Sequence, residues 1–266
     1  MPTTNSARRQ LALITGASAG IGLELSRVFA RHGFDLLLVA CRRDALEAEA
    51  GRLEGKFGIS AKVFPADLSK PEAPSEIADY AANEGLGVDV LVNNAGIGLG
   101  GDFADTDIQR QLEVIRINVA ALTHLTYLFL PPMINRRAGR ILNVASTAAF
   151  QPGPLMAVYY ASKAYVLSFS QAIAEELRNT GVSVTALCPG PTRSEFAETA
   201  QMSESRLFHL TGLATAAEVA EYGYKALISR RRVAIPGVGN KLVAQANRIA
   251  PRILATKIAR MLQERR

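Results

Sequence analysis

Short apolar runs alternate along most of the chain with longer stretches in which apolar residues recur at helical spacing. The short runs predict seven strands, at Leu11–Thr15, Asp35–Cys41, Ala61–Pro65, Val88–Asn93, Arg140–Ala145, Val182–Cys188 and Arg232–Pro236. The stretches between them predict helices over Ile21–His32, Asp44–Phe57, Glu72–Asn83, Asp105–Ile134, Ala157–Thr180 and Ala216–Ser229. Nearly continuous apolar strands separated by helices are typical of a parallel sheet covered on both faces. We therefore predict a doubly wound α/β domain.

The series of strands and helices is expected to form one domain over residues 1–239, because no linker rich in Pro, Gly or Ser divides it. Residues 192–212 follow the sixth predicted strand, lack a strong period and are expected to form a lid. Residues 240–266 form a basic amphipathic extension, in which apolar residues recur on one helical face with a break at Pro251. This pattern fits contact with an anionic membrane surface, or packing on the body or on a partner subunit.

The net charge of +6 belongs to this extension. Residues 240–266 hold seven Lys or Arg and one Glu, which leaves 23 basic and 23 acidic residues in the first 239. The isoelectric point near 9.5 therefore describes the extension. It gives no reason to expect a nucleic-acid partner.

The composition favours a reduced, cytoplasmic protein. The longest uninterrupted apolar runs are of strand length, and residues 1–9 lack the apolar stretch of a signal peptide. Cys41 and Cys188 lie in apolar strand segments, so we expect buried thiols rather than a disulfide or a metal site. No metal-ligand spacing links the three histidines, His32, His124 and His209. We expect His32 and His124, in helices, to be solvated or to pack on other helices, whereas His209 lies in the expected lid and could face substrate.

The first predicted strand leads into a glycine-rich loop and then a helix. Glycines allow a tight turn and close approach to a pyrophosphate, whose charge is favoured at a helix N-terminus. The spacing GxxxGxG differs from the general GxGxxG pattern, and a purely structural turn is the alternative interpretation. The loop residues expected to bind a dinucleotide are Gly16, Ser18, Ala19, Gly20, Ile21 and Gly22.

The end of the second predicted strand indicates NADP(H) rather than NAD(H). A carboxylate there would bind the ribose hydroxyls of NAD and repel the additional phosphate of NADP. This strand instead ends in Arg42 and Arg43. We expect Arg42 to bind the phosphate, because a guanidinium binds phosphate bidentately and stays charged. Arg43 is expected to be solvated at the start of the next helix.

Three further loops follow predicted strands at the edge where such folds bind ligands. Asp67, next to Leu68, either accepts a hydrogen bond from adenine or caps the following helix. The small residues beside Asn94 allow close passage of a ribose, and a rigid turn after the sixth strand suits contact with nicotinamide. The residues expected to touch cofactor here are Asp67, Leu68, Asn94, Ala95, Gly96, Pro189, Gly190 and Thr192.

Tyr159 and Lys163 are four residues apart, so a helix places them on one face. An ammonium beside a phenol favours the phenolate and is expected to lower the pKa of Tyr159. Ser146, at the end of the fifth predicted strand, supplies a second hydroxyl for a carbonyl oxygen. Together these side chains predict a proton donor for carbonyl reduction.

Five motifs in register make the chain resemble the short-chain dehydrogenase/reductase family: Thr15–Gly22, Asn93–Gly96, Ser146, Tyr159 with Lys163, and Pro189-Gly190. The resemblance implies a Rossmann fold with a seven-stranded sheet in the order 3-2-1-4-5-6-7. It implies that Tyr159 is the general acid/base, that Ser146 orients the carbonyl, and that Lys163 binds the nicotinamide ribose. It also implies that the backbone carbonyl of Asn118 holds a water, and that the long central helices form a homodimer or homotetramer.

We therefore predict an NADP(H)-dependent oxidoreductase that reduces a carbonyl by hydride transfer, or oxidises the matching alcohol. The segment 150–156 between Ser146 and Tyr159 is largely apolar and is expected to line the substrate pocket with the lid. An apolar ketone or aldehyde, a 3-oxoacyl thioester or a steroid-like ring would suit it. The alternative is a non-catalytic NADP-binding redox sensor, which would not need the Ser-Tyr-Lys set.

Overall fold

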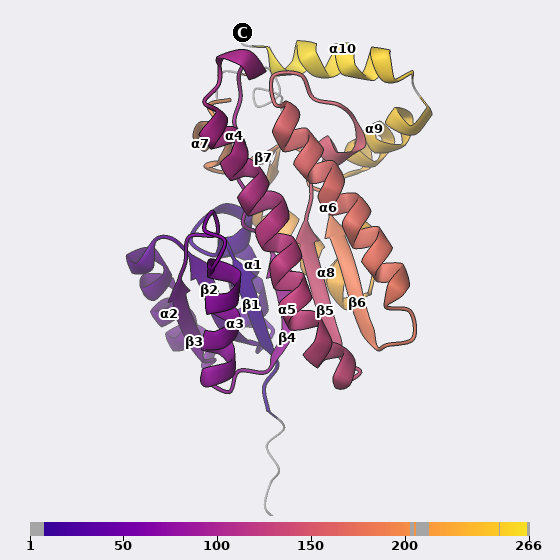
Figure 1. Ribbon diagram of the computed structural model, residues 1–266. Helices are drawn as coiled ribbons and strands as arrows, with labels where there is room; N and C mark the ends of the chain where they lie inside the picture. The colour runs from indigo at the N-terminus through magenta and orange to yellow at the C-terminus, as the bar shows by residue number, and fades with distance from the viewer. Residues whose placement is uncertain (1–7, 203–204, 206–212, 250, 265–266) are drawn as a thin grey trace, which may run out of the picture.

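The computed structural model describes residues 8–202, 205, 213–249 and 251–264. A parallel sheet crosses the molecule in the order β3-β2-β1-β4-β5-β6-β9 (Figure 1). Its strands are β1 Leu11–Thr15, β2 Asp35–Ala40, β3 Ala61–Pro65, β4 Val88–Asn93, β5 Gly139–Val144, β6 Val182–Leu187 and β9 Val233–Ala234. The predicted strand order is confirmed, with β9 in the seventh place. Two short strands, β7 Thr192–Arg193 and β8 Ala214–Thr215, form a separate parallel pair.

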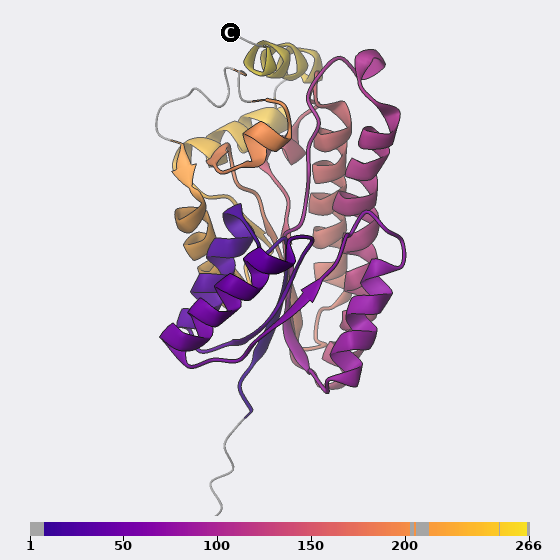
Figure 2. The same ribbon diagram turned by 90° about the vertical axis from the view of Figure 1, so that its left-hand side faces the viewer.

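Helices cover both faces of the sheet, as Figure 2 shows edge-on. One layer holds α1 (Gly20–Arg31), α2 (Arg43–Phe57) and α8 (Ala216–Ile228). The other holds α3 (Ala73–Asn83), α5 (Leu122–Asn135) and α6 (Ala157–Glu176). This arrangement confirms the doubly wound fold that the alternating pattern predicted.

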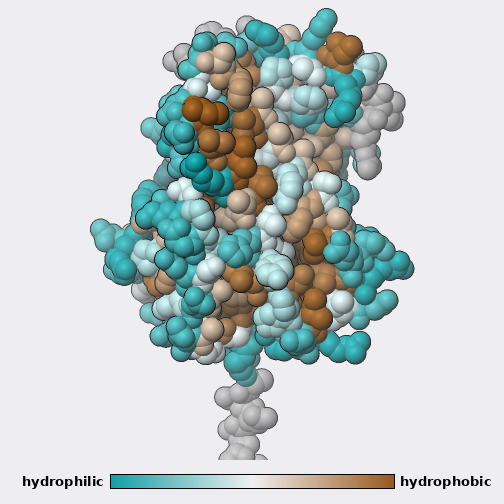
Figure 3. All heavy atoms as spheres, viewed as in Figure 1, coloured by the Kyte–Doolittle hydropathy of each residue, from teal (hydrophilic) through white to brown (hydrophobic). Residues whose placement is uncertain are grey.

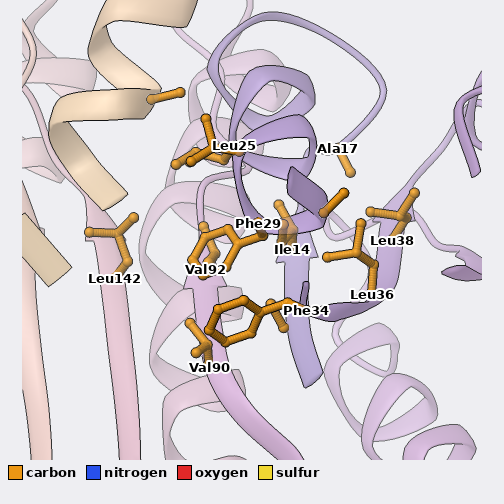
Figure 4. Packing of buried hydrophobic residues seen from close by; sticks show 14 of the residues in the cluster. Ile14, Ala17, Leu25, Phe29, Phe34, Leu36, Leu38, Val90, Val92 and Leu142 are labelled. Atoms are coloured by element: carbon orange, nitrogen blue, oxygen red, sulfur yellow. The ribbon is translucent and has the colours of Figure 1, made fainter. Parts of the chain in front are cut away.

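The strands bury both faces because successive side chains point to opposite sides of the sheet. In β1, Ile14 joins the core under α1, whereas its neighbour Leu13 joins the core under α3 and α5. Figure 4 shows the first core, where Phe29 of α1 meets Phe34 edge-on with ring centroids 5.1 Å apart. Aromatic rings and branched aliphatic side chains therefore hold α1 on the sheet, and the glycine loop precedes this helix directly.

The structure confirms a long helix where one was predicted over 105–134, but a π-helical segment divides it into two α-helical parts. It consists of α4 (Ile108–Ile115), a π-helical segment (Arg116–Ala121) and α5. By length and composition the helix over Ile108–Asn135 is apolar enough to cross a membrane, which the sequence analysis did not expect. In α5, however, buried side chains such as Leu125 and Phe129 belong to the core cluster under the sheet.

An apolar surface gathers over α4 in the upper part of Figure 3. Its exposed side chains include Phe103, Ile108, Leu112 and Ile115, and Tyr127 on α5 is 74% exposed. The homodimer or homotetramer expected through these long helices stays a prediction. An exposed apolar face on the same helices is the feature that such a contact needs.

The C-terminal extension forms two helices, α9 (Val238–Ile249) and α10 (Arg252–Gln263), with Pro251 between them as predicted. Packing of the apolar stripe on the body was one of the interpretations, and it is wrong for Leu242, Ile253, Leu254, Ile258 and Met261, which are exposed. Leu262 is partly buried and lines a cavity. Small residues face inward instead: Ala244, Ala255 and Ala259 are buried. Alanine on the inner side allows the helix backbones to approach the body closely. The large apolar residues of both helices lie on the other sides and are mostly exposed.

Candidate active site

A cavity of about 530 Å³ lies at the carboxyl edge of the sheet, where β1, β4, β5 and β6 end. This is the edge at which open α/β sheets bind ligands. The predicted residues that line it are Gly16, Ser18, Ala19, Gly20, Ile21, Asn94, Ala95, Gly96, Ser146, Tyr159, Lys163, Pro189, Gly190 and Thr192. The fold thus brings together residues that lie far apart in the sequence.

The glycine loop is shaped by close backbone approach. Gly16 has a φ of +65°, and a Cβ on Gly22 would lie 2.2 Å from the carbonyl oxygen of Gly16. Asn94 braces the loop from β4, because its Nδ2 donates to the carbonyl of Thr15 at 2.9 Å. Gly22 and Asn94 therefore support the loop, in addition to the cofactor role expected of them.

The residues present fit a dinucleotide pyrophosphate. Helix α1 begins after Ala19 without a side-chain cap, and its first turn contains no acidic residue. The first backbone N–H groups of a helix have no partner within it, so an uncapped end is suited to an anion. The glycines leave no side chain to fill the approach to these N–H groups.

We expect Gly22→Ala to abolish tight cofactor binding, whereas Gly20→Ala should weaken it much less. The Cβ on residue 22 collides with backbone, which cannot move without deforming the loop. Gly20 has a φ of +54°, and a Cβ there would meet only Ser194, at 3.6 Å. Its strain is limited to about 1–2 kcal/mol. Isothermal titration with NADPH checks this, and equal losses for both variants would contradict it.

Arg42 lies beside the glycine loop but does not line the cavity, and its contact with a cofactor phosphate stays a prediction. Its guanidinium donates to the carbonyl of Ser18 at 3.2 Å, and it also approaches the carboxylate of Glu195 at 3.6 Å. Arg43 pairs with Glu47 one turn along α2, at 3.2 Å, which fits the solvated helix start expected for it. Glu195 lies in the segment expected to form a lid, but its contact with Arg42 was not predicted, since nothing local marks a partner 153 positions earlier.

Asp67 and Leu68 do not line the cavity. Asp67 accepts a hydrogen bond from the backbone N–H of Ser69 at 3.0 Å, which lowers the pKa of the carboxyl. The residue before α3 is Glu72, so the helix-capping interpretation of Asp67 is wrong. Leu68 is 7% exposed, and its side chain packs in the core under α3. Contact of Asp67 and Leu68 with a cofactor stays a prediction.

Tyr159 and Lys163 lie in the first two turns of α6, and both side chains reach the cavity. The Nζ of Lys163 donates to the carbonyl of Val144 at 2.8 Å and lies 5.8 Å from the ring centroid of Tyr159. Ser146 caps a short helical turn through the N–H of Ala148, and its hydroxyl is hydrogen-bonded with Tyr159. The Ser-Tyr-Lys set is therefore assembled at one wall.

The expected lowering of the Tyr159 pKa is wrong for the protein chain by itself. Burial raises this pKa, and the hydrogen bond with Ser146 offsets only part of the effect. Burial also lowers the pKa of Lys163 to about 8, since its ammonium is removed from water. Tyr159 is thus held as a neutral phenol, the form that can donate a proton.

Asn118 lies in the π-helical segment and does not line the cavity. Its side chain accepts from the N–H of Ile97 and donates to the carbonyl of the same residue, both at 2.9 Å. It also donates to Ser162, whose hydroxyl donates to the carbonyl of Tyr159 at 2.7 Å. Asn118 therefore ties the central helix to α6 beside the site. The role of its backbone carbonyl stays a prediction.

The lid and the extension form the remaining wall. The described part of residues 192–212 contains β7 and α7 (Phe196–Thr199), whereas 203–204 and 206–212 lie outside the described residues. His209 belongs to that second group. Ser194, Glu195, Phe196 and Thr199 line the cavity, as expected for residues 192–212. The lining residues that were not expected include Tyr160, Asn240, Val243, Leu262 and Gln263. Several of these come from α9 and α10, which lie at the same end of the molecule in Figures 1 and 2.

The cysteines and histidines take no part in the described site. Cys188 is buried as expected, but Cys41 is exposed, because β2 ends one residue earlier. His32 stacks on Tyr224 with ring centroids 4.2 Å apart, which is the helix packing expected of it. Among the described residues no group of three His, Cys, Asp or Glu side chains could hold a metal ion.

Comparison with known proteins agrees with this geometry. A sequence model described as short chain dehydrogenase matches residues 10–205. The chain is 36% identical over 178 residues to a very-long-chain 3-oxoacyl-CoA reductase of Laccaria bicolor, covering 66% of this chain and 53% of that protein. It is also 36% identical over 183 residues to 17-beta-hydroxysteroid dehydrogenase type 3 of Mus musculus, covering 68% and 59%. The chain thus spans little more than half the length of these relatives.

A solved structure shares nearly the whole fold. A short-chain dehydrogenase from Sphingobium yanoikuyae, in complex with NADPH, superposes with a TM-score of 0.82 and 30% sequence identity. The match covers 90% of this chain and 93% of that one. The similarity therefore extends well beyond the motifs at the site.

Proposed function

This chain belongs to the short-chain dehydrogenase family, and from that premise we propose that it is an NADP(H)-dependent reductase of apolar carbonyl compounds. The family places it among oxidoreductases that act on alcohols and carbonyls. One observation carries the proposal: Tyr159, Ser146 and Lys163 share a cavity with the glycine loop.

The cofactor would be held by the glycine loop, by Arg42 and by Lys163. When bound, its reduced nicotinamide supplies the hydride for a carbonyl carbon. Ser146 and Tyr159 donate hydrogen bonds to the carbonyl oxygen, where negative charge develops in the transition state. Tyr159 then gives its proton to that oxygen, because burial keeps the phenol protonated. Lys163 stabilises the phenolate that remains.

The cavity favours an apolar substrate. Of the described residues that line it, only Lys163 and Glu195 carry charge, so this part of the chain offers no additional cation for a substrate phosphate or carboxylate. Met156, Phe196 and Val243 supply apolar walls. Two of the relatives are named for very-long-chain 3-oxoacyl-CoA and for 17-beta-hydroxysteroids, compounds that carry large apolar groups. We propose a ketone, aldehyde or 3-oxoacyl substrate of this kind.

A panel of carbonyl compounds tests this function directly. Purified protein is mixed with NADPH or NADH and with apolar ketones, aldehydes and 3-oxoacyl thioesters, and loss of the nicotinamide absorbance is followed. Reduction of an apolar carbonyl with NADPH supports the proposal. Tight NADPH binding without turnover on any member would favour the redox sensor instead.

The cofactor preference is tested at the contact between Arg42 and Glu195. We expect Arg42→Gln to raise KM for NADPH by about 10- to 100-fold and to leave KM for NADH nearly unchanged, since a charge-assisted hydrogen bond contributes about 1.5–3 kcal/mol. Glu195→Gln should lower KM for NADPH, because it removes the carboxylate that competes for Arg42. Arg43→Gln is the matched control. Equal effects of Arg42→Gln on both cofactors would contradict the assignment.

A further inference from the structure

The outer surface of α9 and α10 carries large apolar side chains that nothing in the described chain covers. We name as the C-terminal face the exposed residues Val238, Leu242, Ile253, Leu254, Ile258 and Met261. Their exposed fractions run from 47% at Ile258 to 74% at Ile253. Leu254, Ile258 and Met261 are spaced as one stripe of α10, whereas Ala255 and Ala259 form its buried stripe. The face is therefore the unburied side of an amphipathic helix pair.

Cations accompany these apolar residues. Lys241, Arg252 and Lys257 are exposed, and Arg260 is exposed with its Nε 3.3 Å from Glu264. Residues 240–266 carry seven Lys or Arg and one Glu, whereas the rest of the chain has equal numbers of basic and acidic residues. An apolar stripe beside cations is the chemistry that an anionic lipid surface binds.

The C-terminal face adjoins the mouth of the cavity. Leu242 is 66% exposed, and the next residue, Val243, lines the cavity. In the same way Met261 is 51% exposed and is followed by Leu262, which lines the cavity. Gln263 completes the connection, because its amide donates to the hydroxyl of Tyr160, the neighbour of Tyr159. The exposed face and the inner wall are thus consecutive residues of the same helices.

We propose that α9 and α10 dock on an anionic lipid surface and open the cavity toward it, so that a lipid-soluble carbonyl compound enters from the bilayer. The choice of substrate rests on the proposed function, whereas the docking does not. A second copy of this chain fits the C-terminal face less well than an anionic lipid surface does, because a two-fold contact would bring two strongly basic surfaces together. An anionic bilayer offers apolar depth for the stripe and opposite charge for the cations.

Sedimentation with lipid vesicles tests the docking. The full chain should bind vesicles of phosphatidylcholine with phosphatidylglycerol, bind pure phosphatidylcholine weakly, and lose binding at high salt. Lys257→Gln/Arg260→Gln should weaken binding about 25-fold, at about fivefold per cation. Leu254→Gln/Ile258→Gln should weaken it by about tenfold or more without changing net charge. The matched controls are Ile228→Gln, at the last residue of α8, and Arg231→Gln, three residues later, and they should bind as the parent does.

Activity separates docking from the proposed function. The vesicle-binding variants should reduce a short water-soluble ketone at the parental rate but lose rate on a long-chain ketone dissolved in anionic vesicles. If the parent binds vesicles and reduces no carbonyl, docking stands and the proposed function fails. No binding at low salt, or binding unaffected by both double variants, would overturn docking. A concentration-dependent dimer that the Leu254→Gln/Ile258→Gln variant abolishes would also overturn it, with a second copy as the occupant.

Discussion

Tyr159→Phe is expected to lower kcat for carbonyl reduction by about 10³-fold, within the range by which a positioned general acid accelerates a reaction. The substitution removes only the hydroxyl that is hydrogen-bonded with Ser146 and leaves the ring against Phe196. The dissociation constant for NADPH should stay nearly unchanged. Steady-state rates with NADPH, together with titration of NADPH binding, measure both quantities.

Tyr165→Phe on the same helix is the control for this variant. Tyr165 is 39% exposed, lies outside the cavity and shares a hydrogen bond with Thr123. It should keep parental rates. If Tyr159→Phe kept parental rates too, the general acid would be a different group.

Lys163→Met is expected to lower kcat by about 10²-fold. The ammonium lies 5.8 Å from the ring centroid of Tyr159. At that separation, and at an effective dielectric constant near 20, it stabilises a developing phenolate by about 3 kcal/mol.

The same cation also sets a pH dependence. Below pH about 8 Lys163 is protonated, and above it the charge is lost, so kcat/KM for reduction by the parent should fall as pH rises through about 8.

Lys163→Met should lack the fall of kcat/KM near pH 8. A variant that was merely less well folded would lose activity but keep this pH dependence. Its stability should change little. Burial lowers the pKa of Lys163 from 10.5 to about 8, and this shift corresponds to about 3 kcal/mol against the buried cation at neutral pH. Leaving the carbonyl of Val144 without its donor costs about 1–3 kcal/mol. The two effects oppose each other, so a collapse of the thermal unfolding temperature, or an unchanged pH profile, would contradict the assignment.

The repeating patterns of the sequence predicted the sheet, its covering helices and the glycine loop. Strand and helix periodicity is a local property. Leu13 and Ile14 point to opposite cores because they are neighbours in a strand, where successive side chains alternate between the two faces of the sheet. The spacing of Tyr159 and Lys163 belongs to the same class, because four residues make one helical turn. The family's motifs added the order of the strands, which the structure confirms, and the roles expected of Ser146, Tyr159 and Lys163.

The sequence by itself therefore determined the helices and strands, since their patterns depend on residues near one another in the chain. It also marked the candidate catalytic groups. Only the tertiary structure decided what surrounds them. Gln263 meets Tyr160 across 103 positions, and Glu195 meets Arg42 across 153. The local sequence pattern does not predict such contacts, because they depend on how helices and loops pack against one another in the folded chain. The packing of α10 on the body also decided which of its sides is buried. Its alanines face the body, where they allow close approach, and its leucine and isoleucine side chains face outward. Burial likewise reversed the expected shift in the pKa of Tyr159, since desolvation depends on everything packed around a side chain.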